Sequence, residues 1–451
     1  TKNIAIIGNL HVFSPQVMQN AVQNFISLHL FRYADAAVAR PNRVERESQR
    51  TTTGSMANSN LKEAKAAKND EFYTQFHDIE IEMNAYLEYD PNVFRGKTIL
   101  LPCDDPEWSN FTRYFAAKFD ELGLKKLIST SYAPDAKKIK FLSEPTLFET
   151  AAPQFDPSKT QTKGKIFVLD KDISGDGKIN IDDLHWEYLN GDGDFRSKEV
   201  TALRDEADFI ITNPPFSLFR EFLAWIMEGG KRFLVIGNKN CITYKEVFPL
   251  IMHNKIWTGY RSWAGGMWFE TKSETDFDRI DEGVRMKNVP SFWITNIDHG
   301  RRHQPLSLMT MADNLRYSKH KEIRGKETYD HYDNYDAIEV PFTDAIPSDY
   351  DGVMGVPISF LDKYCPEQFE ILGITAGRDE FEARPIKRYI NPGQENKDGS
   401  MTNGSKANTR ATILLQYTPN DIYYLADNAD GPIQILYARL LIKHKSQCSN
   451  E

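Results

Sequence analysis

Short apolar runs alternate with amphipathic segments between residues 97 and 238, and this alternation limits the fold more than any other feature of the chain. Each run has the length of a buried strand, and helical patterns lie between the runs. Strands that alternate with helices predict an α/β fold with a doubly wound, mostly parallel sheet and helices on both faces. Such sheets bind ligands outside the carboxyl ends of their strands. The predicted strands cover residues 98–103, 127–130, 166–169, 209–212 and 233–236.

Two helices in this region are indicated by an apolar face and by end signals. The first covers residues 111–122 and precedes Gly123, a residue type that commonly ends helices. The second follows Ser217, its predicted N-cap, and ends before Gly229.

The length of the chain, 451 residues, predicts more than one hydrophobic core. We expect an N-terminal extension over residues 1–60, an α/β domain over residues 61–300 and a loop-rich region over residues 301–451. Most of the extension is polar without an apolar period, so we expect it to be disordered or dispensable. Few apolar runs occur after about residue 300.

Composition excludes several classes of protein. No apolar run approaches the ~20 residues of a membrane-spanning helix, and no secretory pattern is seen, so a cytoplasmic protein without a membrane partner is expected. The four cysteines form no CxxC pair, which argues against a zinc ribbon or disulfide framework and predicts no metal. With a net charge of −9, any nucleic-acid contact requires a local basic surface.

The strand expected at residues 209–212 runs directly into an Asn-Pro-Pro-Phe turn. The prolines fix φ and stiffen the turn. The Asn213 side-chain oxygen and the Pro214 carbonyl can then accept both hydrogens of one amino group, which frees its lone pair for attack on a methyl sulfonium. Phe216 offers a face on which a base can stack. The predicted catalytic residues are Asn213, Pro214, Pro215 and Phe216.

This chemistry suits adenine N6, a delocalised amine, and requires no metal. A base inside a duplex cannot reach such a pocket, so it must be flipped out at a cost of a few kcal/mol. The alternative is an ordinary turn, because Asn-Pro-Pro also occurs in loops. The strand before the turn and the helix after it favour the functional interpretation.

The turn resembles the catalytic motif of amino-group methyltransferases, and the chain from about residue 56 onward resembles the EcoRI-type modification methylases. The resemblance implies a site-specific adenine-N6 DNA methyltransferase that uses S-adenosylmethionine and acts on a short site resembling GAATTC. It implies a monomer that binds double-stranded DNA, alone or beside a restriction endonuclease that shares its site without forming a complex. The matching stretches are residues 69–75, 103–106, 191–197, 213–219, 242–248, 332–338 and 352–357.

The resemblance also assigns cofactor contacts. Residues 69–75 would hold the methionine part of the cofactor, although this stretch could simply start a helix. Asp104 follows the first strand, where a carboxylate can bind the methionine ammonium, but the usual Gly-x-Gly is absent. Asp194 and Phe195 would hold the cofactor adenine, with a surface turn as the alternative. The assigned residues are Phe72, Tyr73, Thr74, Asp104, Asp105, Asp194 and Phe195.

Residues 172–183 have the spacing of an EF-hand calcium loop, with oxygen-bearing side chains at five ligand positions and glycine at loop position 6, where the loop turns sharply. A strand, not a helix, is expected before this segment, and the sequence contains no second such loop. An acidic surface turn is therefore favoured, with calcium binding as the alternative.

Basic residues cluster after residue 300, and we expect target readout there because cofactor and catalytic motifs fill residues 70–216. For any single residue, a solvated loop charge is the alternative. The predicted DNA contacts are Arg301, Arg302, Arg316, Lys319, Lys321 and Arg324.

Other activities share the Asn-Pro-Pro-aromatic turn. RNA adenine methyltransferases and protein-glutamine methyltransferases carry it, but neither predicts the long C-terminal half. An inactive DNA-binding or regulatory protein is not expected to keep the turn intact. Cytosine-N4 methylation is chemically close, although such enzymes more often have Ser in place of Asn213.

Overall fold

The computed structural model describes residues 73–104, 109–133, 150, 152–271, 273–376 and 383–445. The predicted extension over residues 1–60 lies outside these described residues, as do Phe72 and Asp105.

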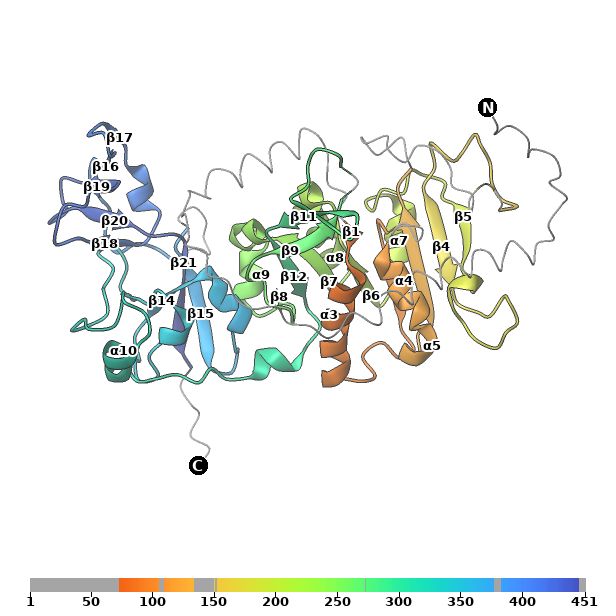
Figure 1. Ribbon diagram of the computed structural model, residues 1–451, viewed down its shortest axis with the longest axis horizontal. Coiled ribbons are helices and arrows are strands. Elements are labelled where there is room, and N and C mark those ends of the chain that lie inside the picture. The colour runs from red at the N-terminus through yellow and green to blue at the C-terminus, as the bar shows by residue number, and fades with distance from the viewer. Residues whose placement is uncertain are drawn as a thin grey trace, which may run out of the picture. The chain divides into compact units, whose positions relative to one another are not determined.

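The largest element is a mixed eight-stranded sheet, here called the main sheet (Figure 1). All five predicted runs form strands of this sheet. In spatial order its strands are β5 (His185–Tyr188), β4 (Lys165–Leu169), β3 (Lys126–Ser131), β2 (Thr98–Leu101), β6 (Phe209–Thr212), β7 (Arg232–Asn238), β12 (Ser291–Thr295) and β8 (Trp257–Thr258).

The expectation of a mostly parallel sheet holds only for the centre. Strands β3, β2, β6 and β7 are parallel neighbours, while β4, β5, β12 and β8 are added antiparallel at the two sides. The chain leaves the sheet at the carboxyl end of β3 and re-enters it beside that same end, because Ser131, the last residue of β3, pairs with Lys165, the first residue of β4. A parallel β4 would have required a crossover connection back to the other end of β3.

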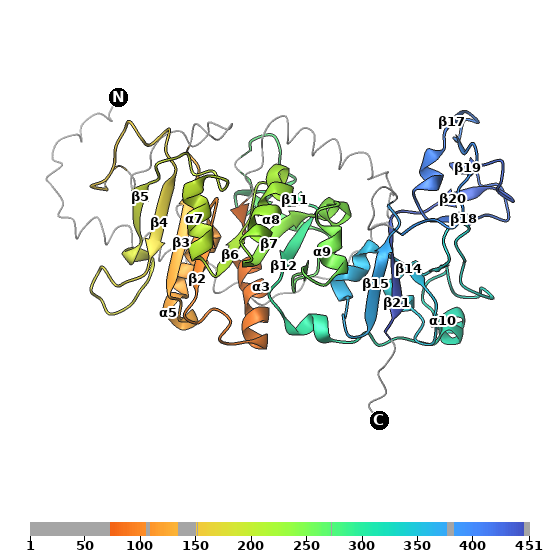
Figure 2. The same cartoon turned by 180° about the vertical axis from the view of Figure 1, so that it is seen from behind.

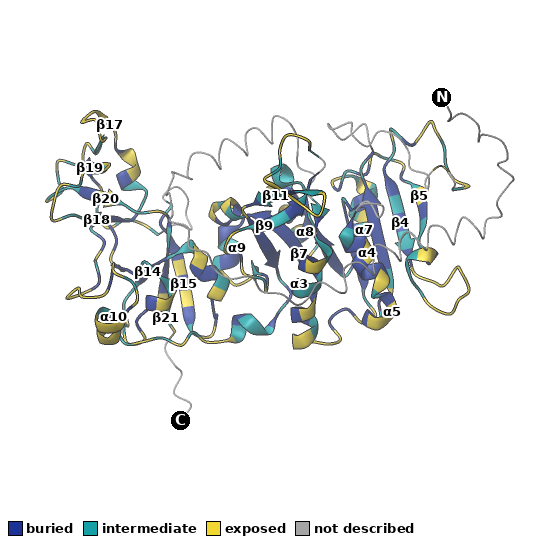
Figure 3. Cartoon of the chain, in the orientation of Figure 1, coloured by how far each residue is buried: buried dark blue, intermediate teal, exposed yellow. Residues whose placement is uncertain are grey.

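Helices cover both faces of the main sheet, as predicted (Figures 1 and 2). Side chains alternate along β2: Ile99 and Leu101 share a core with α3, α4 and α5, whereas Leu100 shares one with α7, α8 and α9. The central strands are buried on both sides (Figure 3). The helices of these two cores are α3 (Phe76–Tyr89), α4 (Asn110–Ala117), α5 (Phe119–Leu122), α7 (Lys198–Glu206), α8 (Phe219–Glu228) and α9 (Phe248–Met252), while α10 (Met311–Tyr317) lies in the region after residue 300.

The helix ends differ in part from the predictions. The helix expected at residues 111–122 is two helices, α4 and α5, separated at Lys118. Gly123 does end the second, with a left-handed φ of 63°. The prediction of Ser217 as N-cap was wrong: Ser217 lies inside a 3₁₀ turn, η4 (Phe216–Leu218), and α8 begins one turn later without a side-chain cap.

A second, smaller sheet packs near the end of β6. It brings residues before the main sheet together with the segment that follows β8, because β1 pairs antiparallel with β9. Its strands in spatial order are β1 (Tyr73–Thr74), β9 (Met267–Glu270), β11 (Val284–Val289) and β10 (Arg279–Asp281).

The region after residue 300 contains more strands than expected. Most are short, and strands of two or three residues cannot show a hydrophobic alternation. One four-stranded sheet consists of β13 (Ile338–Glu339), β14 (Met354–Pro357), β21 (Arg439–His444) and β15 (Phe369–Ile374). A five-stranded sheet consists of β17 (Met401–Asn403), β16 (Gly393–Glu395), β19 (Tyr423–Leu425), β20 (Ile433–Ile435) and β18 (Thr412–Leu414).

One hydrophobic cluster continues from the main sheet into the C-terminal region. It contains Phe292 of β12 together with Phe360 and Leu361, which belong to the 3₁₀ segment η8 (Ile358–Lys363). Thr258 of β8 also donates a hydrogen bond to the Leu361 carbonyl at 3.1 Å. The two regions therefore share a packed core across the boundary predicted near residue 300.

Candidate functional site

The Asn-Pro-Pro-Phe turn lies at the carboxyl end of β6, a central strand of the main sheet. Pro214 is buried, while Asn213, Pro215 and Phe216 are half-buried. The strand is apolar and fully buried up to Thr212, which fixes where the turn emerges. This is the edge at which open α/β sheets bind ligands.

The smaller sheet brings part of the predicted cofactor motif to this turn. The Phe216 ring packs edge-on against Phe269 of β9, with ring centroids 6.4 Å apart. Phe269 pairs with Thr74 in the β1–β9 ladder, and Tyr73 pairs with Glu270. Residues 73–74 and 213–216 are thus joined through one strand, although they are distant in sequence.

Asp104 lies just beyond the end of β2 and is buried, with 7% of its surface exposed. Its Oδ1 accepts a hydrogen bond from Ser109 Oγ at 2.7 Å, and its Oδ2 accepts one from the Thr212 hydroxyl. Thr212 directly precedes Asn213, so the predicted cofactor carboxylate and the predicted catalytic turn are adjacent.

Cys103 supplies the bend that the missing Gly-x-Gly left unexplained. Its φ is 72°, in the left-handed region that glycine normally occupies. An L-residue adopts this conformation at a cost of roughly 1–2 kcal/mol. The chain therefore turns sharply after β2 without a glycine.

Two buried threonine hydroxyls, Thr74 Oγ1 of β1 and Thr130 Oγ1 of β3, have no hydrogen-bond partner among the described residues. The Thr74 carbonyl, in contrast, accepts a hydrogen bond from Asn110 Nδ2 at the start of α4, at 2.8 Å. Buried polar atoms are normally satisfied, so these hydroxyls fit a polar ligand such as the cofactor. Thr74 was predicted to contact it, while Thr130 was not.

The loop at residues 191–194 lies against the end of β3. Asp192 O accepts a hydrogen bond from Ala133 N at 2.8 Å. Gly193 has a φ of 84°, and a Cβ there would collide with the Ser131 carbonyl oxygen, so only glycine fits. The predicted adenine-binding loop is thus next to the strand that follows the Asp104 turn.

Within this loop, Asp194 and Phe195 have different environments. Burial alone would raise the pKa of the Asp194 carboxyl, but hydrogen bonds from Arg196 lower that pKa below its ordinary value. Phe195 is fully buried and packs edge-on against Phe222 and Trp225, at 5.0 and 5.6 Å between ring centroids. The structure therefore gives Phe195 a core position, whereas the prediction had placed its ring against the cofactor adenine.

Tyr132 is a residue that sequence reasoning missed. It follows β3, and burial, helped by the nearby Cys103 and Asp194, raises the pKa of its phenol. Its phenol oxygen is buried without a hydrogen-bond partner among the described residues. Its position directly after the second predicted strand was the available signal, because ligand-binding residues follow such strands.

The calcium-like segment uses its acidic side chains on its own backbone. Asp172 accepts hydrogen bonds from the amides of Gly175 and Gly177, and Asp183 accepts them from Ile173 and Ser174. Strand β4 precedes it, where an EF-hand requires a helix. In the described part of the chain, no group of three or more His, Cys, Asp and Glu side chains could hold a metal ion.

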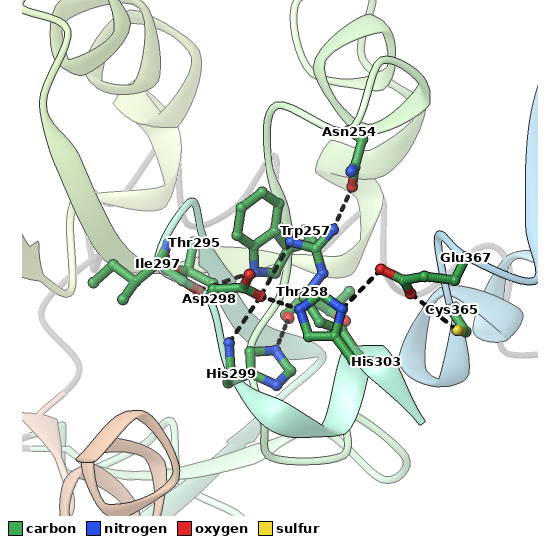
Figure 4. Close-up of polar contacts among 11 residues, drawn as sticks. Asn254, Trp257, Thr258, Thr295, Ile297, Asp298, His299, His303, Cys365 and Glu367 are labelled. Atoms are coloured by element: carbon green, nitrogen blue, oxygen red, sulfur yellow. Dashed lines mark hydrogen bonds and ion pairs between the residues drawn. The ribbon is translucent and has the colours of Figure 1, made fainter. Parts of the chain in front are cut away.

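Arg302, a predicted DNA contact, lies in the protein interior. Its guanidinium is 3.6 Å from the centre of the Trp257 ring and hydrogen-bonds to Asn254. Only 7% of the residue is exposed, and burial lowers the pKa of the guanidinium. Figure 4 shows the surrounding polar contacts, which include Asp298. This packing gives Arg302 a structural position that the pattern of basic residues did not reveal.

Arg301 also has a structural partner. It forms an ion pair with Asp362 of η8, with 2.9 Å between Nη2 and Oδ2, and donates a hydrogen bond to the Tyr260 carbonyl. The arginine therefore links the segment after β12 to the C-terminal region.

The remaining predicted DNA contacts are exposed on and after α10. Arg316 lies 5.1 Å from the Tyr317 ring centre, and Lys319 forms an ion pair with Asp344 at 2.6 Å. Lys321 and Arg324 are exposed. These four side chains remain candidates for phosphate contacts.

Two further cations near the catalytic edge were not singled out from sequence. Arg220 of α8 lies 5.3 Å from the Tyr244 ring centre, and Lys239, which follows β7, lies 5.8 Å from that of Trp263. Cation and aromatic residues together are common where proteins bind single-stranded nucleic acid.

Comparison with known proteins gives a family for this arrangement. The family model described as adenine-specific methyltransferase EcoRI matches residues 60–445. The chain is 41% identical over 329 residues to the Type II methyltransferase M.EcoRI of Escherichia coli, which covers 72% of this chain and 91% of that protein. It is 34% identical over 324 residues to the Type II methyltransferase M.MpnI of Mycoplasma pneumoniae, covering 69% and 85% of the two chains. No solved structure matches the chain.

Proposed function

This chain belongs to the EcoRI family of adenine-specific methyltransferases, and we propose that it transfers a methyl group from S-adenosylmethionine to N6 of an adenine flipped out of double-stranded DNA. It is a DNA adenine methyltransferase of the kind found in restriction-modification systems. The observation that best supports the detailed reaction is the hydrogen bond between Thr212 and Asp104, because it joins the residue before the proposed catalytic turn to the proposed cofactor carboxylate.

The catalytic turn supplies acceptors and a stacking surface. We propose that Asn213 Oδ1 and the Pro214 carbonyl accept the two N6–H groups of the target adenine. The lone pair on N6 is then withdrawn from the ring and directed at the methyl group. Phe216, held by Phe269, provides a face for the adenine ring.

The residues at the ends of β1 and β2 suit the methionine part of the cofactor. When bound, S-adenosylmethionine would supply a methyl group from a sulfonium that leaves as a neutral thioether, while the methylated N6 releases one proton to solvent. We propose that Asp104 binds the methionine ammonium and that Thr74 donates a hydrogen bond to its carboxylate. Asp194 and Tyr132 then lie at the adenine end, beside the close contact of Gly193 with β3.

The chain is expected to act on DNA as a soluble enzyme in the cytoplasm. In the described residues no helix has the length and apolar character to cross a membrane. We further propose that target readout falls to residues after 300 and that a partner nuclease, where one exists, acts on the same site independently. These proposals follow from the family and from the exposed cations near α10.

One experiment tests the reaction and its rivals together. The purified chain is incubated with tritiated S-adenosylmethionine and, separately, with genomic DNA, total RNA and release-factor protein. We expect label in DNA only, recovered as N6-methyladenine after nucleoside digestion, and methylation-sensitive sequencing then gives the target site. Label in RNA or protein alone, or N4-methylcytosine as the product, would overturn the proposal.

A further inference from the structure

The hydroxyl of Thr212 joins the catalytic strand to the cofactor strand. Thr212 is the last residue of β6, is fully buried and directly precedes Asn213. Its Oγ1 lies 2.7 Å from the carbonyl oxygen of Pro102 and also contacts Asp104 Oδ2. Both acceptors belong to the segment that follows β2, so one side chain spans the two strand ends.

Asp104 is held from three sides by hydroxyl groups. Ser109, the N-cap of α4, binds one carboxylate oxygen, and Thr212 binds the other. Ser129 of β3 donates to the Asp104 main-chain carbonyl. Of the three hydroxyls, that of Thr212 alone belongs to the strand that carries the catalytic turn, so it is the one through which a change at Asp104 reaches Asn213.

A carboxylate has about four lone-pair sites, and the two hydroxyls use one on each oxygen. They fix the plane of the carboxylate, which decides where a bound ammonium would lie. A threonine hydroxyl carries one proton and donates to one acceptor at a time. When Asp104 is ionised, the charge-assisted bond to its carboxylate is the stronger of the two available to Thr212.

We propose that Thr212 is a positioning residue that couples cofactor binding to the geometry of the catalytic turn. This inference rests on the proposed function, because it takes Asp104 as the ligand of the cofactor ammonium. Cofactor bound at Asp104 orients the carboxylate, the carboxylate orients Thr212, and Thr212 fixes the start of the turn that holds Asn213.

The test compares Thr212→Val with Thr212→Ser in the full chain. Valine has nearly the same shape without the hydroxyl, and serine keeps the hydroxyl. We expect Thr212→Val to raise the Kd for S-adenosylmethionine roughly 10-fold, the effect of losing one hydrogen bond to a charged group. We expect it also to lower the single-turnover methylation rate, at saturating cofactor and DNA, by about 10-fold or more. Thr212→Ser should keep both values near those of the unaltered protein.

Two further variants separate positioning from general damage to the fold. Thr295→Val removes an equally buried hydroxyl of the main sheet, far from Asp104. The Thr295 hydroxyl donates a hydrogen bond to the carbonyl of Phe233, near the start of β7, at 2.6 Å. This variant should lower thermal stability similarly without changing cofactor affinity or rate. Ser109→Ala should weaken cofactor binding while sparing the rate at saturation, since in the described part of the chain the Ser109 side chain bonds to Asp104 and to the first amides of α4, and not to β6.

The outcomes are distinct. If Thr212→Val matches the unaltered protein in Kd and rate, the coupling is wrong while the proposed function stands. Equal losses in Thr295→Val would overturn it too, because the effect would then be one of stability. If the unaltered chain neither binds S-adenosylmethionine nor methylates DNA, the proposed function fails, and the inference fails with it.

Discussion

The main sheet and the C-terminal sheets bury polar groups in different ways. In the main sheet, the central strands are apolar along their length, and polar side chains collect at the carboxyl edge around Asp104 and Thr212. In the C-terminal region, charged pairs lie inside the fold: Arg439 binds Glu339 between β21 and β13, with 2.7 Å between Nη2 and Oε1. The first region is an apolar scaffold with chemistry at one edge, whereas the second depends on specific polar pairs for its own shape.

The largest expected effect is at the edge of the main sheet. Asn213→Ala removes one of the two proposed acceptors for the adenine amino group. Loss of one such preorganised hydrogen bond typically lowers a rate by about 10²–10³. We expect this loss in single-turnover methylation, with circular dichroism and cofactor affinity unchanged. A folded Asn213→Ala enzyme with full activity would show that the turn is not catalytic.

The C-terminal region should respond in stability instead. Glu339→Gln leaves the Arg439 guanidinium buried without its counter-charge and weakens the bond from Tyr332. Breaking a buried pair in this way lowers the free energy of unfolding by about 3 kcal/mol or more. Unfolding in urea measures this loss. Cofactor affinity of the folded protein should not change.

Glu370→Gln is the matched control for that variant, because Glu370 lies exposed on β15 of the same sheet. It should change the free energy of unfolding by less than about 0.5 kcal/mol. Equal effects of the two substitutions would mean that the buried pair does not hold the C-terminal sheet.

The contrast between the regions also explains how far the sequence could predict them. The five apolar runs were recognised as strands because buried strands need continuous apolar side chains, and this pattern survives in one dimension. Strand direction was not recoverable: β4 is an apolar run like the parallel strands β2, β6 and β7, and only its pairing shows that it is antiparallel to β3.

At the site, the sequence could predict which residues lie close together where the backbone decides their position. Asn213 and Asp104 follow central strands, so their adjacency follows from the sheet, while their roles stay predictions. The burial of Phe195 and Arg302 could not be predicted, because tertiary packing makes an aromatic ring in a cofactor-like motif and an arginine in a basic cluster core residues. Thr212 was read only as part of a strand, because its partners come from a distant segment.

DNA binding should separate exposed cations from structural ones. Replacing Arg316, Lys321 and Arg324 together with glutamine should lower DNA affinity about 10-fold at moderate salt and reduce the salt dependence by about one counterion per lost phosphate contact. Arg302→Gln should instead lower thermal stability and leave the salt dependence unchanged, because its guanidinium is packed on Trp257. Fluorescence anisotropy across a salt series measures both. Should the triple variant bind DNA as tightly as the unaltered chain, readout must lie elsewhere.

The smallest expected effect lies at the junction between the two regions, where His303 bridges them. Its Nε2 is 2.8 Å from Asp298 and its Nδ1 is 2.9 Å from Glu367, which precedes β15, as Figure 4 shows. Tyr89 stacks on the ring at 5.7 Å between centroids. Both ring nitrogens face carboxylates, so the protonated form is the one that fits.

Burial alone would lower the pKa of His303, but its bonds to Glu367 and Asp298 raise that pKa above its ordinary value of 6.5. A raised pKa stabilises the fold fully below the unfolded value, and this stability is lost as pH rises through the folded pKa. The pKa of Glu367 is lowered: burial is the largest single effect and acts to raise it, but the hydrogen bonds from His303 and Cys365 and the charge of His303 together outweigh burial. Its contribution is therefore present above its ordinary value of 4.5 and is lost as pH falls through the folded pKa.

The bridge is therefore complete between the lowered pKa of Glu367 and the raised pKa of His303. His303→Gln should destabilise the protein by about 1 kcal/mol or less at pH 5.5–6, as expected for a partly exposed pair, and the difference should shrink as pH rises well above 7. Urea unfolding at several pH values measures this. His77→Gln is the control, because His77 is exposed and lies 3.9 Å from Glu80. A destabilisation of His303→Gln that is constant from pH 5.5 to 9 would mean that packing on Tyr89, not charge, joins the regions there.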